Sequence, residues 1–165
     1  MKRIEGFFKH TMHVIAVILF ILCGFLLVKS YTQVSAGDMT ETPNVSYSDV
    51  MNNSMNQKTI LVFFEPGTDK EKKVKINLQN KTQSLGIKDR PKIVYQSSQS
   101  KNGVRMMQRF SVNRIHSLYI VPIYKGKEVS SIDGLNTDDI NQNIYQNNVV
   151  NSNVVASLIT GYWRA

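Results

Sequence analysis

The chain is poor in the residues that carry thiol and metal chemistry. It has one cysteine, Cys23, among 165 residues, and its three histidines do not form a metal-ligand cluster. A lone cysteine can form neither an internal disulfide nor a thiolate zinc site. The sequence also lacks a phosphate-binding P-loop and a dinucleotide-binding glycine motif. These absences argue against thiol, metal and nucleotide-dependent enzymes, and we expect no cofactor and no metal site.

One long apolar run occurs, and it lies near the N-terminus. Residues 11–28 contain no Asp, Glu, Lys or Arg, and a helix of this length spans about 27 Å, close to the bilayer core of about 30 Å. Lys2, Arg3 and Lys9 precede the run. The positive-inside rule then places residues 1–10 in the cytoplasm and the rest of the chain outside. We predict an uncleaved, single-pass anchor in the cell membrane.

A cleaved signal peptide is the alternative to an anchor. Val34, Ser35 and Ala36 provide small residues suited to a signal peptidase, and cleavage after Ala36 would give a secreted protein. The apolar run is at or beyond the usual length of the hydrophobic core of a signal peptide, about 7–15 residues, which favours the anchor. Residues 29–45 are polar, contain Gly and Pro and show no apolar period. This composition predicts a linker.

Beyond the linker, strand patterns alternate with helix patterns. We predict strands at 60–64, 92–96, 118–124 and 128–132, and helices at 46–55, 71–85, 104–110 and 135–146. From Thr59 the order is therefore β-α-β-α-β-β-α. This order predicts the α/β class, with a mixed sheet flanked by helices.

Several details of this prediction depend on single residues. Gly86 is expected to end the second helix, and Pro122 indicates an edge strand or the end of a ladder. The asparagine-rich stretch 147–153 is expected to be irregular. Residues 154–165 are apolar enough either to pack back on the domain or to bind a partner.

The stretch 59–73 combines a strand, a sharp turn and a helix start. The apolar run at 60–64 is short and rich in β-branched and aromatic residues, so it predicts a strand buried on both faces. Pro66 and Gly67 then break the strand. Thr68 and Glu71 have the spacing of a capping box. The turn follows the carboxyl end of the strand, where α/β folds usually bind ligands.

This segment resembles the active-site segment of the thioredoxin fold, in which the helix opens with Cys-x-x-Cys-Lys. Thr68 and Glu71 stand where the two cysteines would be, and Lys72 follows. The hairpin pattern at 119–133 is a second point of resemblance. The resemblance covers 46–147 and leaves 148–165 as a C-terminal tail.

The resemblance implies a degenerate member of the family whose redox centre is replaced by a helix cap. Thr68 lacks an accessible anion near neutral pH and Glu71 cannot resolve a disulfide, so the thiol mechanism is lost. The loop before the third predicted strand, which carries a cis-proline in the family, has no proline here. The candidate interaction surface comprises Pro66, Gly67, Thr68, Glu71, His116 and Ser117.

These observations predict a membrane-anchored, extracytoplasmic, thioredoxin-like protein that is not an enzyme. It would act as a binding, scaffold or accessory subunit with a protein partner in the envelope. It resembles small Gram-positive envelope proteins that accompany export and conjugation machineries. One alternative is a thiol-disulfide oxidoreductase or disulfide chaperone of the same family. The other is an assembly subunit of a secretion or conjugation complex with a different fold.

Positive charge is concentrated in one part of the chain. Residues 58–127 contain 15 Lys and Arg and 4 acidic residues, whereas residues 128–165 contain 1 basic and 4 acidic residues. Solvated helix faces are one interpretation. Attraction to anionic lipid or to an anionic wall polymer is the other. No nucleic-acid partner is expected, because the aromatic residues near these charges have the pattern of core residues.

Overall fold

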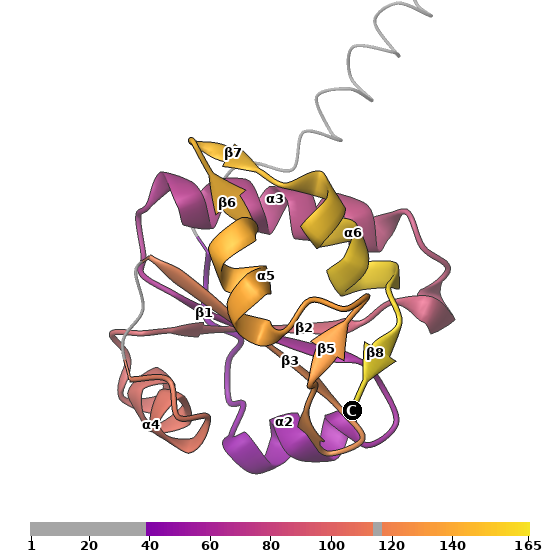
Figure 1. Cartoon of the computed structure of the whole chain (residues 1–165). Coiled ribbons are helices and arrows are strands. Elements are labelled where there is room, and N and C mark those ends of the chain that lie inside the picture. The colour runs from indigo at the N-terminus through magenta and orange to yellow at the C-terminus, as the bar shows by residue number, and fades with distance from the viewer. Residues whose placement is uncertain (1–38, 114–116) are drawn as a thin grey trace, which may run out of the picture. The chain divides into compact units, whose positions relative to one another are not determined.

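The computed structural model describes residues 39–113 and 117–165 (Figure 1). The predicted span at 11–28, residues 29–38 of the predicted linker, and His116 lie outside these residues. The described residues fall within one compact unit. Its architecture is α/β, with a mixed central sheet flanked by helices, as the sequence predicts. Within the described part of the chain, no helix combines the length and apolar character needed to cross a membrane.

The central sheet is mixed, with one parallel and two antiparallel pairs of neighbouring strands. Its strands are β1 (Thr59–Phe64), β2 (Lys92–Ser97), β3 (Leu118–Tyr124) and β4 (Lys127–Glu128), in the order β2-β1-β3-β4. β1 runs parallel to β2 and antiparallel to β3, and β4 is antiparallel to β3. Every residue of β1 is buried, which confirms the prediction of a strand covered on both faces.

Helices cover both faces of this sheet (Figure 1). On one face lie α3 (Asp69–Gln83), α5 (Thr137–Asn143) and α6 (Ser152–Thr160), and on the other lie α2 (Tyr47–Ser54) and α4 (Lys101–Arg109). The side chains of β1 alternate between two cores, because successive residues of a strand point to opposite faces. Ile60, Val62 and Phe64 face the first core, and Leu61 and Phe63 face the second.

Two short ladders and a 3₁₀ turn complete the domain. The ladders pair β5 (Ser131–Ile132) with β8 (Trp163–Arg164) and β6 (Tyr145–Gln146) with β7 (Val149–Val150), and the 3₁₀ turn is η1 (Ile87–Asp89). The predicted strand at 128–132 is therefore wrong as one element. After β4 the chain leaves the central sheet, and buried Ile132 pairs with buried Trp163.

Three other boundaries differ from the prediction. The helix predicted at 135–146 is shorter, since α5 ends at Asn143 and Tyr145–Gln146 form β6. α4 begins at Lys101 rather than at Val104, because the Ser100 hydroxyl accepts the Gly103 N–H at 2.9 Å and caps the helix. Gly86 does not end α3. Ser84 is the C-cap of that helix, and Gly86 has a φ of −59° and precedes η1.

The stretch 147–153 is also more regular than predicted. Asn147 and Asn148 have φ values of 50° and 63°, and they form the turn between β6 and β7. Asparagine tolerates this left-handed region better than most residues, and such turns suit two-residue hairpins. The side chain of Asn151 then caps α6.

Pro122 lies where the β3–β4 ladder ends, one of the two predicted placements. The Pro122 carbonyl accepts the Val129 N–H at 3.0 Å. In a strand, the nitrogen and carbonyl of one residue face the same neighbouring strand. The position of the missing N–H of Pro122 therefore faces residue 129, just beyond the two residues of β4. Because it points away from β1, the pairing of β3 with β1 is unaffected.

Both chain ends of the described region contact the sheet layers. The Thr42 N–H donates to the Tyr95 carbonyl at 2.8 Å, and the Thr42 hydroxyl accepts the Tyr95 N–H at 2.9 Å. Residues 39–45 thus cover the outer edge of β2, which would otherwise expose unpaired backbone groups. At the other end, α6 packs on α3, so residues 154–165 pack back on the domain.

The close approach of α4 to β2 leads to a stability prediction at Gly103. A Cβ atom there would lie 1.8 Å from the carbonyl oxygen and 2.8 Å from the carbonyl carbon of Ser97, which are backbone atoms and cannot rotate away. An exposed helical Gly→Ala change usually stabilises by about 1 kcal/mol. We expect Gly103→Ala instead to destabilise by about 1–3 kcal/mol, because the extra methyl group overpacks the site.

Thermal unfolding of the full chain, followed by circular dichroism, measures this effect. Gln108→Ala, an exposed change in the same helix, is the control and should alter stability by less than about 0.5 kcal/mol. A Gly103→Ala variant that melts at or above the wild-type temperature would contradict the packing described here.

Candidate functional site

The turn after β1 forms an exposed tip at the carboxyl edge of the sheet. Pro66 and Gly67 are exposed, and Gly67 has a φ of +87°. Proline followed by a residue with positive φ is typical of a type II turn, in which glycine avoids the steric cost. The Gly67 Cα faces open space. The tip is therefore accessible to a partner.

Thr68 and Glu71 form the predicted capping box at the start of α3. The Thr68 hydroxyl accepts the Glu71 N–H at 3.3 Å, and the Glu71 carboxylate accepts the Thr68 N–H at 3.3 Å. The same carboxylate accepts the Gly67 N–H at 2.8 Å. Thr68 also donates its hydroxyl proton to the Glu65 carbonyl at 3.4 Å. Both side chains therefore form hydrogen bonds with backbone groups of the turn and the helix start.

Glu71 has a further partner that lies far away in the sequence. Its carboxylate accepts the N–H of Met39, 32 residues earlier. The side chain of Glu71 is fully buried, so hydrogen bonds from the backbone must replace those from water. Glu71 is thus an internal support of the turn rather than a group that a partner can touch. Nothing in the local sequence indicates the contact with Met39.

Ser117 lies against the same turn. Its carbonyl accepts the Glu65 N–H at 2.8 Å, and its φ of 71° bends the chain into β3. The structure therefore brings five of the six predicted site residues together at one edge of the sheet: Pro66, Gly67, Thr68, Glu71 and Ser117. The sixth, His116, lies outside the described residues.

This edge presents few side-chain groups to solvent. The groups that reach its surface include the Pro66 ring, the Gly67 backbone, the exposed Asp69 and the half-buried residues Thr68 and Ser117. Within residues 39–113 and 117–165, no three His, Cys, Asp or Glu side chains come close enough to hold a metal ion. The edge can present a fixed shape and a few hydrogen-bonding groups to a partner.

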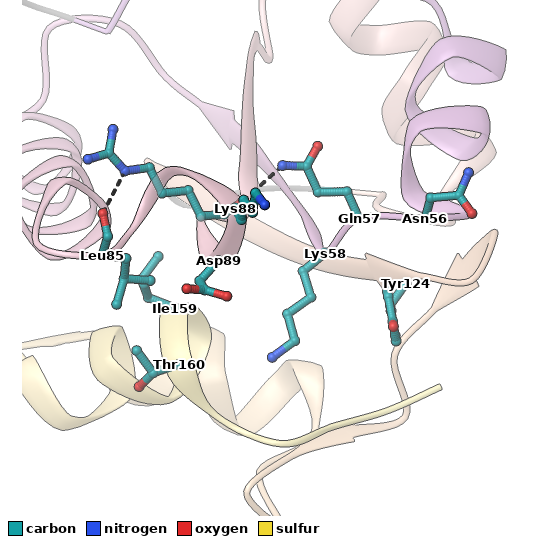
Figure 2. Close-up of a pocket in the computed structure, with 10 residues that line it drawn as sticks. Asn56, Gln57, Lys58, Leu85, Lys88, Asp89, Tyr124, Ile159 and Thr160 are labelled. Carbon is teal, nitrogen blue, oxygen red and sulfur yellow. Dashed lines mark hydrogen bonds between the residues drawn. The ribbon is translucent and has the colours of Figure 1, made fainter.

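A second candidate site lies at the opposite end of the sheet (Figure 2). It is a hollow of about 480 Å³ beside the start of β1 and the end of β3, lined by Asn56, Gln57, Lys58, Leu85, Lys88, Asp89, Arg90, Tyr124, Ile159 and Thr160. Three of these residues are cationic and one is acidic. Figure 2 shows the Lys58 and Asp89 side chains directed into the same space. The sequence prediction missed this hollow, because its walls come from four separate segments.

The cations of this hollow are largely engaged by the protein itself. Lys58 Nζ donates to the Gly161 carbonyl at 2.7 Å and lies 5.4 Å from the centre of the Trp163 ring. Burial lowers the pKa of Lys58, while the charge of Asp133 acts in the opposite direction. The Arg90 guanidinium donates to the carbonyls of residues 83 and 85. Lys58 and Arg90 therefore hold the ends of α6 and α3 in place.

Comparison with known proteins finds no matching family, no similar curated protein and no similar solved structure.

The capping box leads to a prediction for Thr68 and Glu71. Thr68→Ala should destabilise the protein by about 0.5–2 kcal/mol, and Thr68→Ser or Thr68→Asp by much less, because both retain an acceptor for the Glu71 N–H. Glu71→Gln should cost about 1–3 kcal/mol, since it places an amide NH₂ among backbone N–H donors.

Thermal melts of these variants test the prediction, with Glu65→Gln as the control for removal of a nearby charge. If Thr68→Ala melts at the wild-type temperature, the hydroxyl is not a cap. If Glu71→Gln is no less stable than Glu65→Gln, the buried carboxylate does not support the turn.

Proposed function

We propose that this chain is a membrane-anchored, extracytoplasmic domain of thioredoxin-like fold that lacks redox activity and acts by binding a protein partner. It would serve as a scaffold or accessory subunit, and an export or conjugation machinery is the assembly that the sequence resemblance suggests. The anchor is the apolar run at 11–28, preceded by Lys2, Arg3 and Lys9.

The sheet supports the thioredoxin-like part of this proposal. Two parallel strands joined by a helix, followed by an antiparallel hairpin on the other side of β1, also describe the core of the thioredoxin fold. In the present sheet, β1 and β2 are the parallel pair and β3 and β4 are the hairpin, which gives the strand order β2-β1-β3-β4. The turn before α3 occupies the place of the redox motif, and the chain before β3 lies beside it through the bond between Glu65 and Ser117.

The observation that best supports a binding role is that the turn after β1 is both fixed by a helix cap and exposed at its tip. Thr68 and Glu71, which stand in place of the two cysteines, are used as a helix cap, whereas Pro66 and Gly67 remain exposed. The hydrogen bonds of the cap hold this exposed tip in one conformation. A rigid surface loses little conformational entropy when it binds, which favours recognition of a partner.

Site-specific photocrosslinking in intact cells tests this role. A photoreactive amino acid placed at Pro66 or Asp69 lies at the tip, and one placed at Gln83 lies at the far end of the same helix and is also exposed. We expect a discrete crosslinked protein from positions 66 and 69 and none from position 83. Equal crosslinking at position 83, or none at 66 and 69, would contradict a binding role for this edge.

The thiol oxidoreductase alternative makes a different prediction. Thiol-disulfide exchange needs an attacking thiolate and a second thiol to resolve the mixed disulfide, and Cys23 is the only cysteine of the chain. We expect the full chain to reduce insulin no faster than buffer with dithiothreitol alone. Clear turnover above this background, retained in Thr68→Ala, would favour the alternative.

The second alternative is an assembly subunit with a different fold. It shares the predicted anchor and the partner, but it does not require contact through the turn after β1. Crosslinking that mapped to another face, with none at positions 66 and 69, would favour it.

A further inference from the structure

The exposed face of α4 carries two arginines with no partner among the described residues. Arg105 and Arg109 are one helical turn apart, so their side chains project from the same face. Both residues are exposed, and α4 contains no acidic residue. Neither guanidinium forms a hydrogen bond or an ion pair within residues 39–113 and 117–165. Their donors are therefore available to a ligand.

These arginines line a groove between α4 and α2. The groove has a volume of about 390 Å³ and is lined by Tyr47, Asn102, Arg105, Met106, Gln108 and Arg109. The Tyr47 ring is fixed against Phe110, with 5.1 Å between ring centres. Met106 is buried beneath the groove. The groove thus has a firm base, an aromatic wall and two cations, and no carboxylate lines it.

The acidic side chains of α2 and of residues 39–45 are already engaged. On α2, the Asp49 carboxylate accepts the Ser46 N–H at 2.8 Å and the Ser46 hydroxyl at 2.6 Å. At the start of α4, the Glu41 carboxylate accepts the Ser97 N–H and the Ser100 hydroxyl. Neither carboxylate neutralises the arginines of the groove.

The groove differs in this respect from the larger hollow of Figure 2. There, Lys58 and Arg90 bind backbone carbonyls, and Asp89 lies among the cations. An anion entering that hollow would meet a carboxylate, and two of its three cations are already used as donors. In the groove it would meet two unpaired guanidinium groups.

We propose that this groove binds a phosphate group, as a monoester or a diester, between Arg105 and Arg109. The planar guanidinium offers paired N–H donors that match phosphate oxygens, and charge-assisted bonds of this kind are stronger than neutral ones. The Tyr47 hydroxyl and the Gln108 amide provide further donors at the walls. The phosphate belongs either to a soluble phosphoester or to the head group of an anionic phospholipid.

This inference goes beyond the proposed function and does not depend on it. The groove lies on the α2 and α4 face, and the proposed partner site lies at the turn after β1. The crosslinking experiment at positions 66 and 69 can therefore fail while phosphate binding holds, and the reverse is also true.

Nuclear magnetic resonance of the full chain in a neutral detergent tests the proposal with inorganic phosphate as the probe. The arginine Nε–H signals of residues 105 and 109 should shift on addition of phosphate and should not respond to chloride at equal ionic strength. In Arg105→Gln/Arg109→Gln the apparent affinity, read from backbone amide signals of α4, should fall by about tenfold or more.

Two control variants separate recognition from general attraction. Lys81→Gln/Lys88→Gln removes the same charge from exposed positions outside the groove, and its affinity should stay within about twofold of the wild type, since exposed charges at a distance are screened. Arg105→Lys/Arg109→Lys keeps the charge but loses the planar donor pair, and its affinity should fall. Equal loss in the Lys81→Gln/Lys88→Gln variant, or an unchanged affinity in Arg105→Gln/Arg109→Gln, would overturn the proposal.

A second titration identifies the source of the phosphate group. Glycerol 3-phosphate and short-chain phosphatidylglycerol are compared, with short-chain phosphatidylcholine as the lipid without net charge. A response to phosphatidylglycerol that exceeds the response to glycerol phosphate and needs the arginines supports a lipid head group. A response to glycerol phosphate alone supports a soluble ligand. If neither compound shifts the signals of Arg105 and Arg109, the groove is not a phosphate site.

Discussion

The buried carboxylate of Glu71 is the contact on which the carboxyl edge of the sheet depends. It accepts N–H groups from Met39, Gly67 and Thr68, and it lies at the positive end of the α3 dipole. Three parts of the chain therefore meet at one side chain: the segment before α2, the turn after β1, and the start of α3. A carboxylate buried without such donors would be strongly unfavourable. The Glu71 carboxylate is thus fully buried and hydrogen-bonded to the backbone of this edge.

The same arrangement occurs at the next helix along the sheet. Glu41 accepts the Ser97 N–H and the Ser100 hydroxyl where β2 leads into α4. The two parallel strands are thus each followed by a helix start with a hydrogen-bonded carboxylate: buried Glu71 of α3 itself, and half-buried Glu41 from the segment before α2. In many α/β folds this edge binds an anionic ligand through helix N-termini. Here the carboxylates of Glu71 and Glu41 already accept hydrogen bonds from the backbone at this edge.

The parts of the fold that could be predicted from the sequence are those determined by residues close to one another in the sequence. The buried strand β1 follows from five consecutive apolar residues, and the capping box follows from the spacing of Thr68 and Glu71. The limits of β3 were also predicted to the residue. In each case the interactions that fix the element lie within a few residues or along one strand.

The contacts that were missed join residues distant in the sequence. The bond from Met39 to Glu71 spans 32 residues, and the bonds from Thr42 and Glu41 to the end of β2 span more than 50. The ladder of β5 with β8 similarly joins the hairpin region to the C-terminus. These pairings result from the burial of Met39, Ile132 and Trp163, and no local pattern encodes which segments meet.

The number of basic residues in a segment is not enough to locate an anion-binding site. Residues 58–127 have a strong excess of basic side chains, and this excess creates a long-range potential wherever each side chain points. Short-range recognition depends instead on donors that the protein leaves unused. Lys58 and Arg90 bind carbonyls at helix ends, whereas Arg105 and Arg109 bind nothing within the described part of the chain. The excess of charge attracts anions to the domain in general, and the free guanidinium groups decide where a phosphate would stay.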